Sequence, residues 1–153
     1  MIKYIPGMTN VVLEEIPGKL TLAVEISNCQ GNCIGCHSPW LKEDTGQELT
    51  PDVISGLIKD NYGVNCFLLL GEGRDRQALL DTAAFLKAGF PDIETALYSG
   101  RVDVEKDLWE AFDYIKTGPY IEEYGPLNSP STNQRLYYHG QDITSRFWAK
   151  KKG

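Results

Sequence analysis

The sequence has little positive charge. Its 15 lysines and arginines stand against 21 aspartates and glutamates, which gives a net charge of −6 over 153 residues. A protein whose main partner is a nucleic acid usually presents a basic face. The basic run Lys150 to Lys152, at the end of the sequence, is typical of a solubilising tail. We therefore expect no nucleic-acid partner.

Long apolar stretches are also missing. A membrane-spanning helix needs roughly 20 apolar residues, whereas the apolar runs here are short, such as Phe67 to Leu70. The first residues do not show the basic-then-apolar layout of a secretory signal. These absences predict a cytoplasmic protein with no membrane partner. Thiols stay reduced in the cytoplasm, so grouped cysteines indicate a metal site or catalysis before disulfides.

Histidine is scarce, with two in the chain, which leaves little for a hydrolytic mechanism of the Ser–His–Asp type. The composition is otherwise that of an ordinary globular protein, 42% hydrophobic and 24% charged. A chain of 153 residues can bury one real hydrophobic core. We expect a single domain over residues 1–153.

Hairpins are expected at both ends of the chain. The first joins β-rich runs at residues 11–15 and 20–26, with Pro17 and Gly18 at the turn. The second begins with a strand at residues 135–138 and turns at residues 139–141.

Helical periodicity alternates with apolar runs between the two hairpins. Helices and strands are expected in turn at residues 51–62, 64–70, 78–86, 93–98, 103–109 and 114–117. Thr50 is the expected N-cap of the first helix and Asp103 that of the third. The alternation predicts an α/β fold with a mostly parallel sheet and flanking helices. About six strands would form an open, small partial (β/α) barrel rather than a closed one of eight.

The unusual residues of the sequence follow the expected parallel strands. They occupy residues 29–37, 71–73, 99–101 and 117–120. Parallel strands end at one edge of a sheet, and ligands bind beyond that edge. The sequence therefore predicts one shared site there.

Three cysteines, Cys29, Cys33 and Cys36, form what we call the cysteine triplet. Their three-then-two spacing can wrap one metal centre, but three thiolates do not fill the four iron sites of a cubane cluster. Either Cys66 is the fourth ligand or one iron stays open for a small molecule. We favour the open iron, because Cys66 lies in an apolar run where a free cysteine acts as a small hydrophobic residue.

A zinc site is the rival interpretation of the cysteine triplet. Three cysteines and His37 would make a Cys₃His set, which structural zinc sites use. His37 directly follows Cys36, however, and adjacent residues rarely bind the same zinc ion.

The cysteine triplet, placed directly after a first strand, resembles the signature of the radical S-adenosylmethionine (radical SAM) superfamily. Gly35, which stands before the third cysteine, makes the motif similar to that of the activating proteins of anaerobic ribonucleoside-triphosphate reductase. Residues 113–123 and 132–135 resemble the closing motifs of that family. The resemblance covers most of the chain.

The resemblance implies a 4Fe-4S cluster on the cysteine triplet and S-adenosyl-L-methionine on the open iron. It places the adenine near Gly35, Cys36 and His37, and the methionine part near Gly71 and Glu72. The cysteines would be both metal ligands and the catalytic residues. One departure concerns the Gly-Gly-acidic stretch that the family carries: Leu70 stands where the first glycine is expected, and it would crowd the methionine part unless Gly73 substitutes.

The implied activity is an oxidoreductase that makes a 5′-deoxyadenosyl radical and installs a glycyl radical on the reductase. A low-potential electron donor such as flavodoxin or ferredoxin is implied as well. Lys116 is either a carboxylate or partner contact or a solvent-facing lysine, and residues 133–135 (Asn133, Gln134 and Arg135) either line the mouth of the site or cap a loop. Alternatives are an activase of another glycyl-radical enzyme, a non-enzymatic iron–sulfur electron carrier and a zinc-stabilised binding module.

Overall fold

The computed structural model describes residues 2–12, 16–27, 46–73, 75–119, 121–125, 127 and 129–149. In chain order the elements are β1 (Lys3–Tyr4), a 3₁₀ helix (Pro6–Met8), β2 (Asn10–Val12), β3 (Thr21–Glu25), β4 (Gln47–Glu48), α1 (Pro51–Asp60), β5 (Cys66–Leu70), α2 (Arg76–Gly89), β6 (Glu94–Tyr98), α3 (Lys106–Ala111), β7 (Tyr114–Thr117), β8 (Arg135–Tyr138), β9 (Gln141–Asp142) and α4 (Arg146–Ala149).

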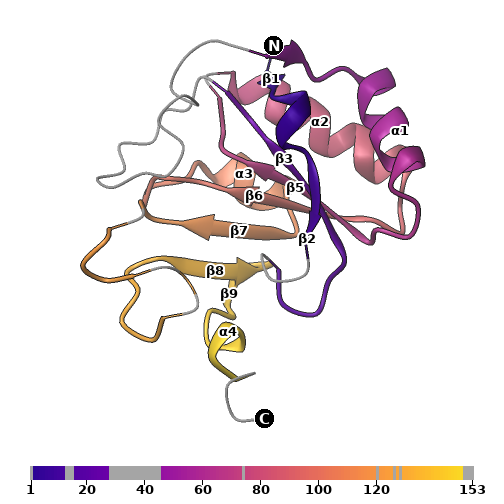
Figure 1. The fold of residues 1–153 in the computed structure, drawn as a ribbon. Helices are drawn as coiled ribbons and strands as arrows, with labels where there is room; N and C mark the ends of the chain where they lie inside the picture. The colour runs from indigo at the N-terminus through magenta and orange to yellow at the C-terminus, as the bar shows by residue number, and fades with distance from the viewer. Residues whose placement is uncertain are drawn as a thin grey trace.

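The main sheet has seven strands in the order β2-β3-β5-β6-β7-β8-β9 (Figure 1). Its four central strands, β3, β5, β6 and β7, are parallel, and the pairs at both margins are antiparallel. The predicted α/β fold is confirmed, with a mixed sheet that is parallel at its centre. The sheet is open, because β2 and β9 are its two outermost strands. A separate two-stranded sheet pairs β1 with β4.

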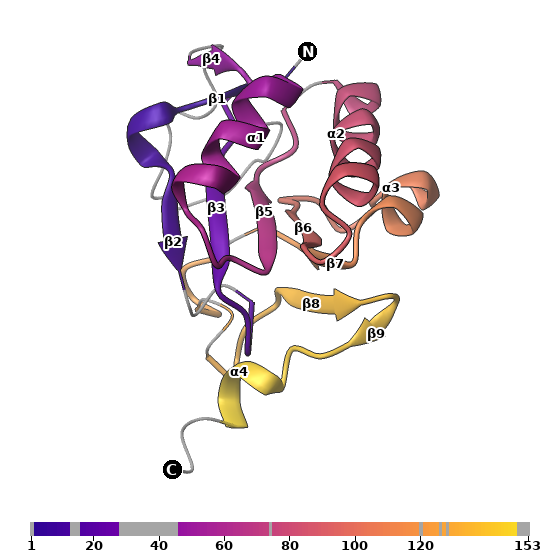
Figure 2. The same cartoon turned by 90° about the vertical axis from the view of Figure 1, so that its right-hand side faces the viewer.

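Helices α1, α2 and α3 each connect two successive parallel strands and lie along one face of the sheet (Figure 2). Their buried side chains Ile54, Leu79, Leu86 and Leu108 pack in one cluster with alternate residues of the strands, among them Phe67. Helices on one face are the expected result when strands are added in chain order with crossovers of one hand. We call this the helix face.

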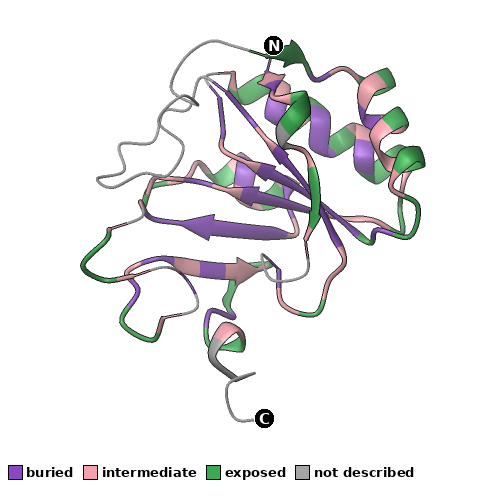
Figure 3. Ribbon diagram, viewed as in Figure 1, coloured by how far each residue is buried: buried purple, intermediate pink, exposed green. Residues whose placement is uncertain are grey.

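The opposite face, which we call the inner face, has its own cluster. Ala23, Leu68 and Ala96 project from the strands, and Leu127 and Ile143 from the C-terminal part of the chain cover them. Strands β5 to β7 are buried for most of their length because both faces are covered (Figure 3).

The helix starts follow capping rules, with one correction. Thr50 Oγ1 accepts a hydrogen bond from the Val53 amide at 3.2 Å, so the predicted cap of α1 is confirmed. The prediction that Asp103 caps the third helix is wrong, because α3 begins at Lys106 behind Glu105. The Glu105 carbonyl accepts hydrogen bonds from the amides of Leu108 and Trp109, and Asp103 lies exposed before the helix.

Both predicted hairpins are present. Strands β2 and β3 pair with Val11 opposite Leu22. The link between β8 and β9 consists of His139 and Gly140, with φ values of 48° and 83°. Positive φ at both positions is what a tight type I′ hairpin turn requires. None of the helices in the described ranges has the length and hydrophobicity to cross a membrane.

Candidate functional site

The four parallel strands end level with one another. Glu25 of β3 pairs with Leu70, Leu70 with Tyr98, and Tyr98 with Lys116. The segments that follow these strand ends are therefore brought to one margin of the sheet, which we call the carboxyl edge. This confirms that the segments after β5, β6 and β7, which the sequence singles out, lie together.

Five predicted site residues, Cys29, Cys33, Gly35, Cys36 and His37, fall outside the described residues. Their place in the chain is nevertheless informative, because the described part before them ends just past β3, at the carboxyl edge. Their ligands and geometry stay predictions.

The turn after β5 is built by two glycines around a buried acid. Gly71 and Gly73 have φ values of 118° and 65°, which side chains rarely tolerate. Glu72 between them is 4% exposed. Its Oε2 accepts from Ser99 Oγ at 2.6 Å and from Arg101 Nε at 2.9 Å, and its Oε1 accepts from the same guanidinium. The carboxylate thus joins the ends of β5 and β6.

Arg101 extends this contact into a charged network. Its guanidinium also lies 2.6 Å from Glu105, and Arg76 reaches both Glu105 and Asp107. Hydrogen bonds to Glu72 and Glu105 raise the pKa of Arg101, and the bond from Arg101 lowers the pKa of Glu105. Because its charge is balanced by two carboxylates, Arg101 is poorly placed to bind an anionic ligand as well.

A buried lysine faces the inner side of the same edge. Lys116 is 7% exposed, its Nζ donates to the Gly118 carbonyl at 3.1 Å and it lies 5.3 Å from the centre of the Tyr98 ring. Leu70 and Tyr98 pack on the inner-face cluster too. A buried ammonium requires acceptors or an anion, which makes Lys116 the strongest anion-binding candidate among the described residues of this edge.

Leu70, which stands where the family carries a glycine, is the last residue of β5 and packs on the inner face. Gly73 lies on the other side of the turn and does not occupy the place of the missing glycine. A Cβ at Gly73 would lie 3.2 Å from Ile2 Cγ2 and 3.4 Å from Ile26 Cγ2, against residues of the helix-face cluster.

The polar run before β8 adds two amides to the edge. Gln134 Nε2 donates to the Gly118 carbonyl at 3.3 Å, and Asn133 Nδ2 donates to the Pro119 carbonyl at 3.0 Å. Asn133 Oδ1 is buried and has no hydrogen-bond partner among the described residues. Such an atom is costly unless a donor reaches it. Arg135 instead pairs with Asp142 of β9 at 2.8 Å, away from this group.

Cys66 lies at the other margin of the sheet, the amino edge, at the first position of β5. It is fully buried with a free thiol, and burial raises its pKa to about 12. The prediction that Cys66 is a free, buried cysteine is confirmed. About 13 Å of strand separates it from Leu70 at 3.3 Å per residue, which argues against Cys66 as a cluster ligand at the carboxyl edge.

The amino edge also holds a polar group that the sequence reasoning missed. Ligand-type atoms of Glu94, Asp113 and His139 lie within 4.8 Å of one another. Glu94 is held by Lys19 at 2.5 Å and by the Tyr138 hydroxyl at 2.7 Å.

Burial alone would raise the pKa of Glu94, but the hydrogen bonds from Lys19 and Tyr138 outweigh it and lower the pKa. Asp113 accepts from the Thr95 amide at 2.8 Å and lies 3.2 Å from His139 Nε2. The acids are already satisfied by protein donors, so the group is best explained as a structural network. The three residues come together through the register of neighbouring strands, and no local sequence motif reveals that register.

Comparisons with known protein families, curated proteins and solved structures find no match for this chain. The functional argument therefore depends on the carboxyl edge and on the motifs of the sequence.

Proposed function

We propose that this chain is a radical SAM enzyme that installs a glycyl radical on anaerobic ribonucleoside-triphosphate reductase. The observation that carries the proposal is the level ending of four parallel strands, with the cysteine triplet directly after the first of them. Ligands of such sheets bind beyond the carboxyl ends of the strands. Helices along one face and strands in chain order support the finer proposal of a partial (β/α) barrel of the radical SAM type.

The cysteine triplet would hold three irons of a 4Fe-4S cluster and leave the fourth for S-adenosyl-L-methionine. When bound and given one electron from a flavodoxin or ferredoxin, this pair supplies methionine and a 5′-deoxyadenosyl radical, which takes a hydrogen atom from a glycine of the reductase and becomes 5′-deoxyadenosine. Backbone near Gly35, Cys36 and His37 would border the adenine.

The described residues of the carboxyl edge suit such a ligand. The buried Lys116 ammonium would bind the carboxylate of the methionine part. Asn133 Oδ1, a buried acceptor without a donor, would accept from an N–H group of the cofactor or of the partner polypeptide. Glu72 would act by holding the Gly71–Gly73 turn in place, because its oxygens already accept from Ser99 and Arg101.

The test is metal analysis and electron paramagnetic resonance of anaerobically reconstituted, reduced protein, with and without S-adenosyl-L-methionine. About four irons per chain and a signal that changes on adding the cofactor would support an open iron. Formation of 5′-deoxyadenosine and of a glycyl radical on the reductase would complete the case. If the reductase stays inactive while another glycyl-radical enzyme is activated, the proposed radical chemistry would hold but the proposed partner would be wrong.

Two other results would overturn the proposal. Iron with a signal that ignores the cofactor would indicate an electron carrier. One zinc and no iron would indicate a zinc-stabilised binding module.

A further inference from the structure

A cavity of about 380 Å³ lies between α1 and α2, beside the small β1–β4 sheet. We call it the α1–α2 groove. Its apolar lining comes from Ile2, Leu49, Ile54, Ala78 and Phe85. The first three are almost fully buried, so they form the floor, while Ala78 and Phe85 on α2 are partly exposed. The volume is in the range of pockets that hold a ligand or a large side chain.

The polar lining of the groove has one sign of charge. Glu48 and Asp81 are exposed acids, and Asp75 caps α2 by accepting from the Ala78 amide at 3.1 Å. Among the described residues that line the groove there is no lysine or arginine. An apolar floor with acids around it complements a ligand that carries an apolar group next to a positive charge.

The groove lies directly behind the turn of the carboxyl edge. Ile2 forms part of its floor and also lies 3.2 Å from the position of a Cβ on Gly73. Asp75 lines the groove two residues after that glycine. An occupant of the groove would therefore contact Ile2 and Asp75, which adjoin the turn of the carboxyl edge.

We propose that the α1–α2 groove docks a segment of a partner protein in which a large apolar side chain is followed by lysine or arginine. The apolar side chain covers the floor beside Ala78 and Phe85, and the basic residue meets Glu48 and Asp81. Charge complementarity selects this occupant. The proposal does not depend on radical chemistry, since it concerns the helix side of the edge and holds for any activity performed there.

The probe is a synthetic peptide with one phenylalanine followed by two lysines between Gly-Ser flanks, added to the isotope-labelled full chain. Amide signals of Gln77, Ala78 and Asp81 in nitrogen–proton correlation spectra should shift and saturate. Asp81→Lys and Ala78→Trp should each weaken binding about tenfold, the first by reversing a charge and the second by filling the cavity. Asp81 is exposed, so its variant tests the groove even if the tryptophan variant fails to fold.

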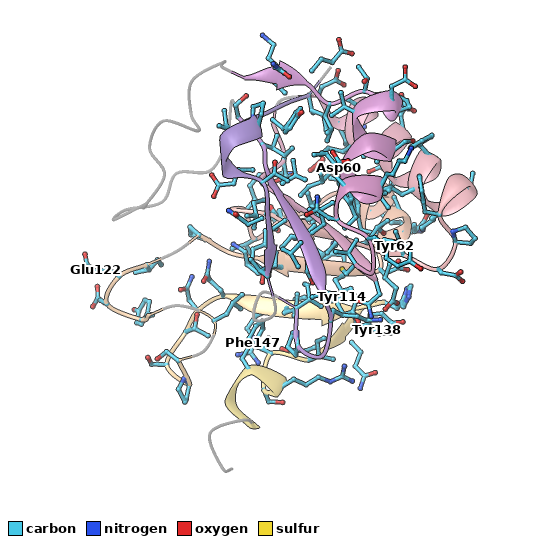
Figure 4. All side chains as sticks on the ribbon, turned by 45° about the vertical axis from the view of Figure 1, so that its right-hand side comes forward. Asp60, Tyr62, Tyr114, Glu122, Tyr138 and Phe147 are labelled. Carbon is cyan, nitrogen blue, oxygen red and sulfur yellow. The ribbon has the colours of Figure 1, made fainter. Side chains whose placement is uncertain are left out.

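The matched control is Asp60→Lys, which makes the same charge change at the other end of α1, where Figure 4 labels the residue. It should bind the peptide like the unaltered protein. Equal weakening by Asp60→Lys and Asp81→Lys, or equal binding of a peptide with glycine in place of phenylalanine, would overturn the proposal by showing unspecific charge attraction.

Two further outcomes would assign the groove to another occupant and overturn the partner segment. Shifts of the same amides with protein concentration alone, removed by replacing Lys150, Lys151 and Lys152 with alanine, would indicate a second copy. Binding of phenethylamine as tight as that of the peptide would indicate a small cationic ligand. Absence of any shift with the peptide would contradict docking altogether.

Discussion

The two edges of the parallel sheet are both polar, but their polar groups do different things. At the amino edge the carboxylates of Glu94 and Asp113 each accept from donors of neighbouring strands and turns. Tyr114 and Tyr138, which Figure 4 labels, lie beside this group. Their ring centres are 4.6 Å apart. The two carboxylates of this group are therefore already satisfied by protein donors.

At the carboxyl edge one buried acceptor lacks a donor among the described residues. This atom is Asn133 Oδ1, whereas the buried Lys116 ammonium donates to the Gly118 carbonyl. An unsatisfied buried acceptor is costly, and a ligand that donates a hydrogen bond to it would offset that cost. The comparison teaches that a short distance between ligand-type side chains does not by itself mark a binding site. Whether their polar atoms already have hydrogen-bond partners distinguishes a structural network from a candidate site.

The largest difference is expected between replacement of the cysteine triplet and replacement of Cys66. Cys29→Ala, Cys33→Ala and Cys36→Ala should each abolish cluster binding and 5′-deoxyadenosine formation, because each removes an iron ligand. Cys66→Ala should keep both, since its thiol is buried at the amino edge. Iron per chain and product formation are the measurements. Loss of iron in Cys66→Ala, with an unchanged circular dichroism spectrum, would make Cys66 a ligand and end the open-iron hypothesis.

The two partly shielded lysines offer a matched pair for cofactor affinity. Lys116→Met should weaken S-adenosyl-L-methionine binding by about tenfold or more, because it removes a charge-assisted contact in a buried place. Lys19→Met deletes the same charge at the amino edge and should leave that affinity unchanged. Equilibrium dialysis under anaerobic conditions measures both. Unchanged binding in Lys116→Met would show that the carboxylate is held elsewhere.

The paired glutamates test stability at the two edges. Glu72→Gln should lower the free energy of unfolding by about 2–4 kcal/mol, because the guanidinium of Arg101 would lose a buried charged partner. Glu94→Gln should cost about 1 kcal/mol or less, since the Glu94 and Lys19 side chains are 24% and 25% exposed.

Urea unfolding with unchanged m values measures the two losses. If Glu72→Gln cost no more than Glu94→Gln, the turn after β5 would not depend on its carboxylate. An equal effect on cofactor binding by both variants would contradict a special role for the carboxyl edge.

Local signals in the sequence were sufficient for most of the fold. Thr50 before Pro51 marked the start of α1, and the continuous apolar run before Gly71 marked a strand buried on both faces. The choice of Asp103 as a cap was wrong because a nearby acid, Glu105, takes the position before the helix and pairs with Arg101. Capping preference favours aspartate over glutamate, so by itself it selected the wrong one of these two acids.

Contacts between distant strands could not be predicted in the same way. Glu72 and Arg101 are 29 residues apart, and Tyr138 is 44 residues from Glu94. Both pairs form because strand register and turn geometry bring their segments together, which no spacing in the sequence encodes. The meeting of Gly71 with the ends of neighbouring strands was predictable, because parallel strands share one edge. The sequence did not predict which polar groups at this edge have hydrogen-bond partners.

The smallest expected effect concerns pH and again separates the edges. Burial raises the pKa of Cys66 from 9.0 to about 12, so the unfolded chain loses this proton at a lower pH than the folded chain. The stability that the thiol contributes is complete below pH 9 and falls as pH rises toward 12. Burial raises the pKa of Tyr114 as well, which adds a loss in the same direction at higher pH.

Between pH 8 and 10 the unaltered chain should therefore lose about 1 kcal/mol more stability than Cys66→Ala, because alanine has no proton to release on unfolding. Urea unfolding of both proteins at intervals across this range gives the difference, in which the titrations that the two chains share cancel. Parallel curves would mean that the thiol is more accessible than its burial implies. In that case the burial of Cys66 would no longer count against it as a ligand, and its distance along β5 from the carboxyl edge would be the remaining argument.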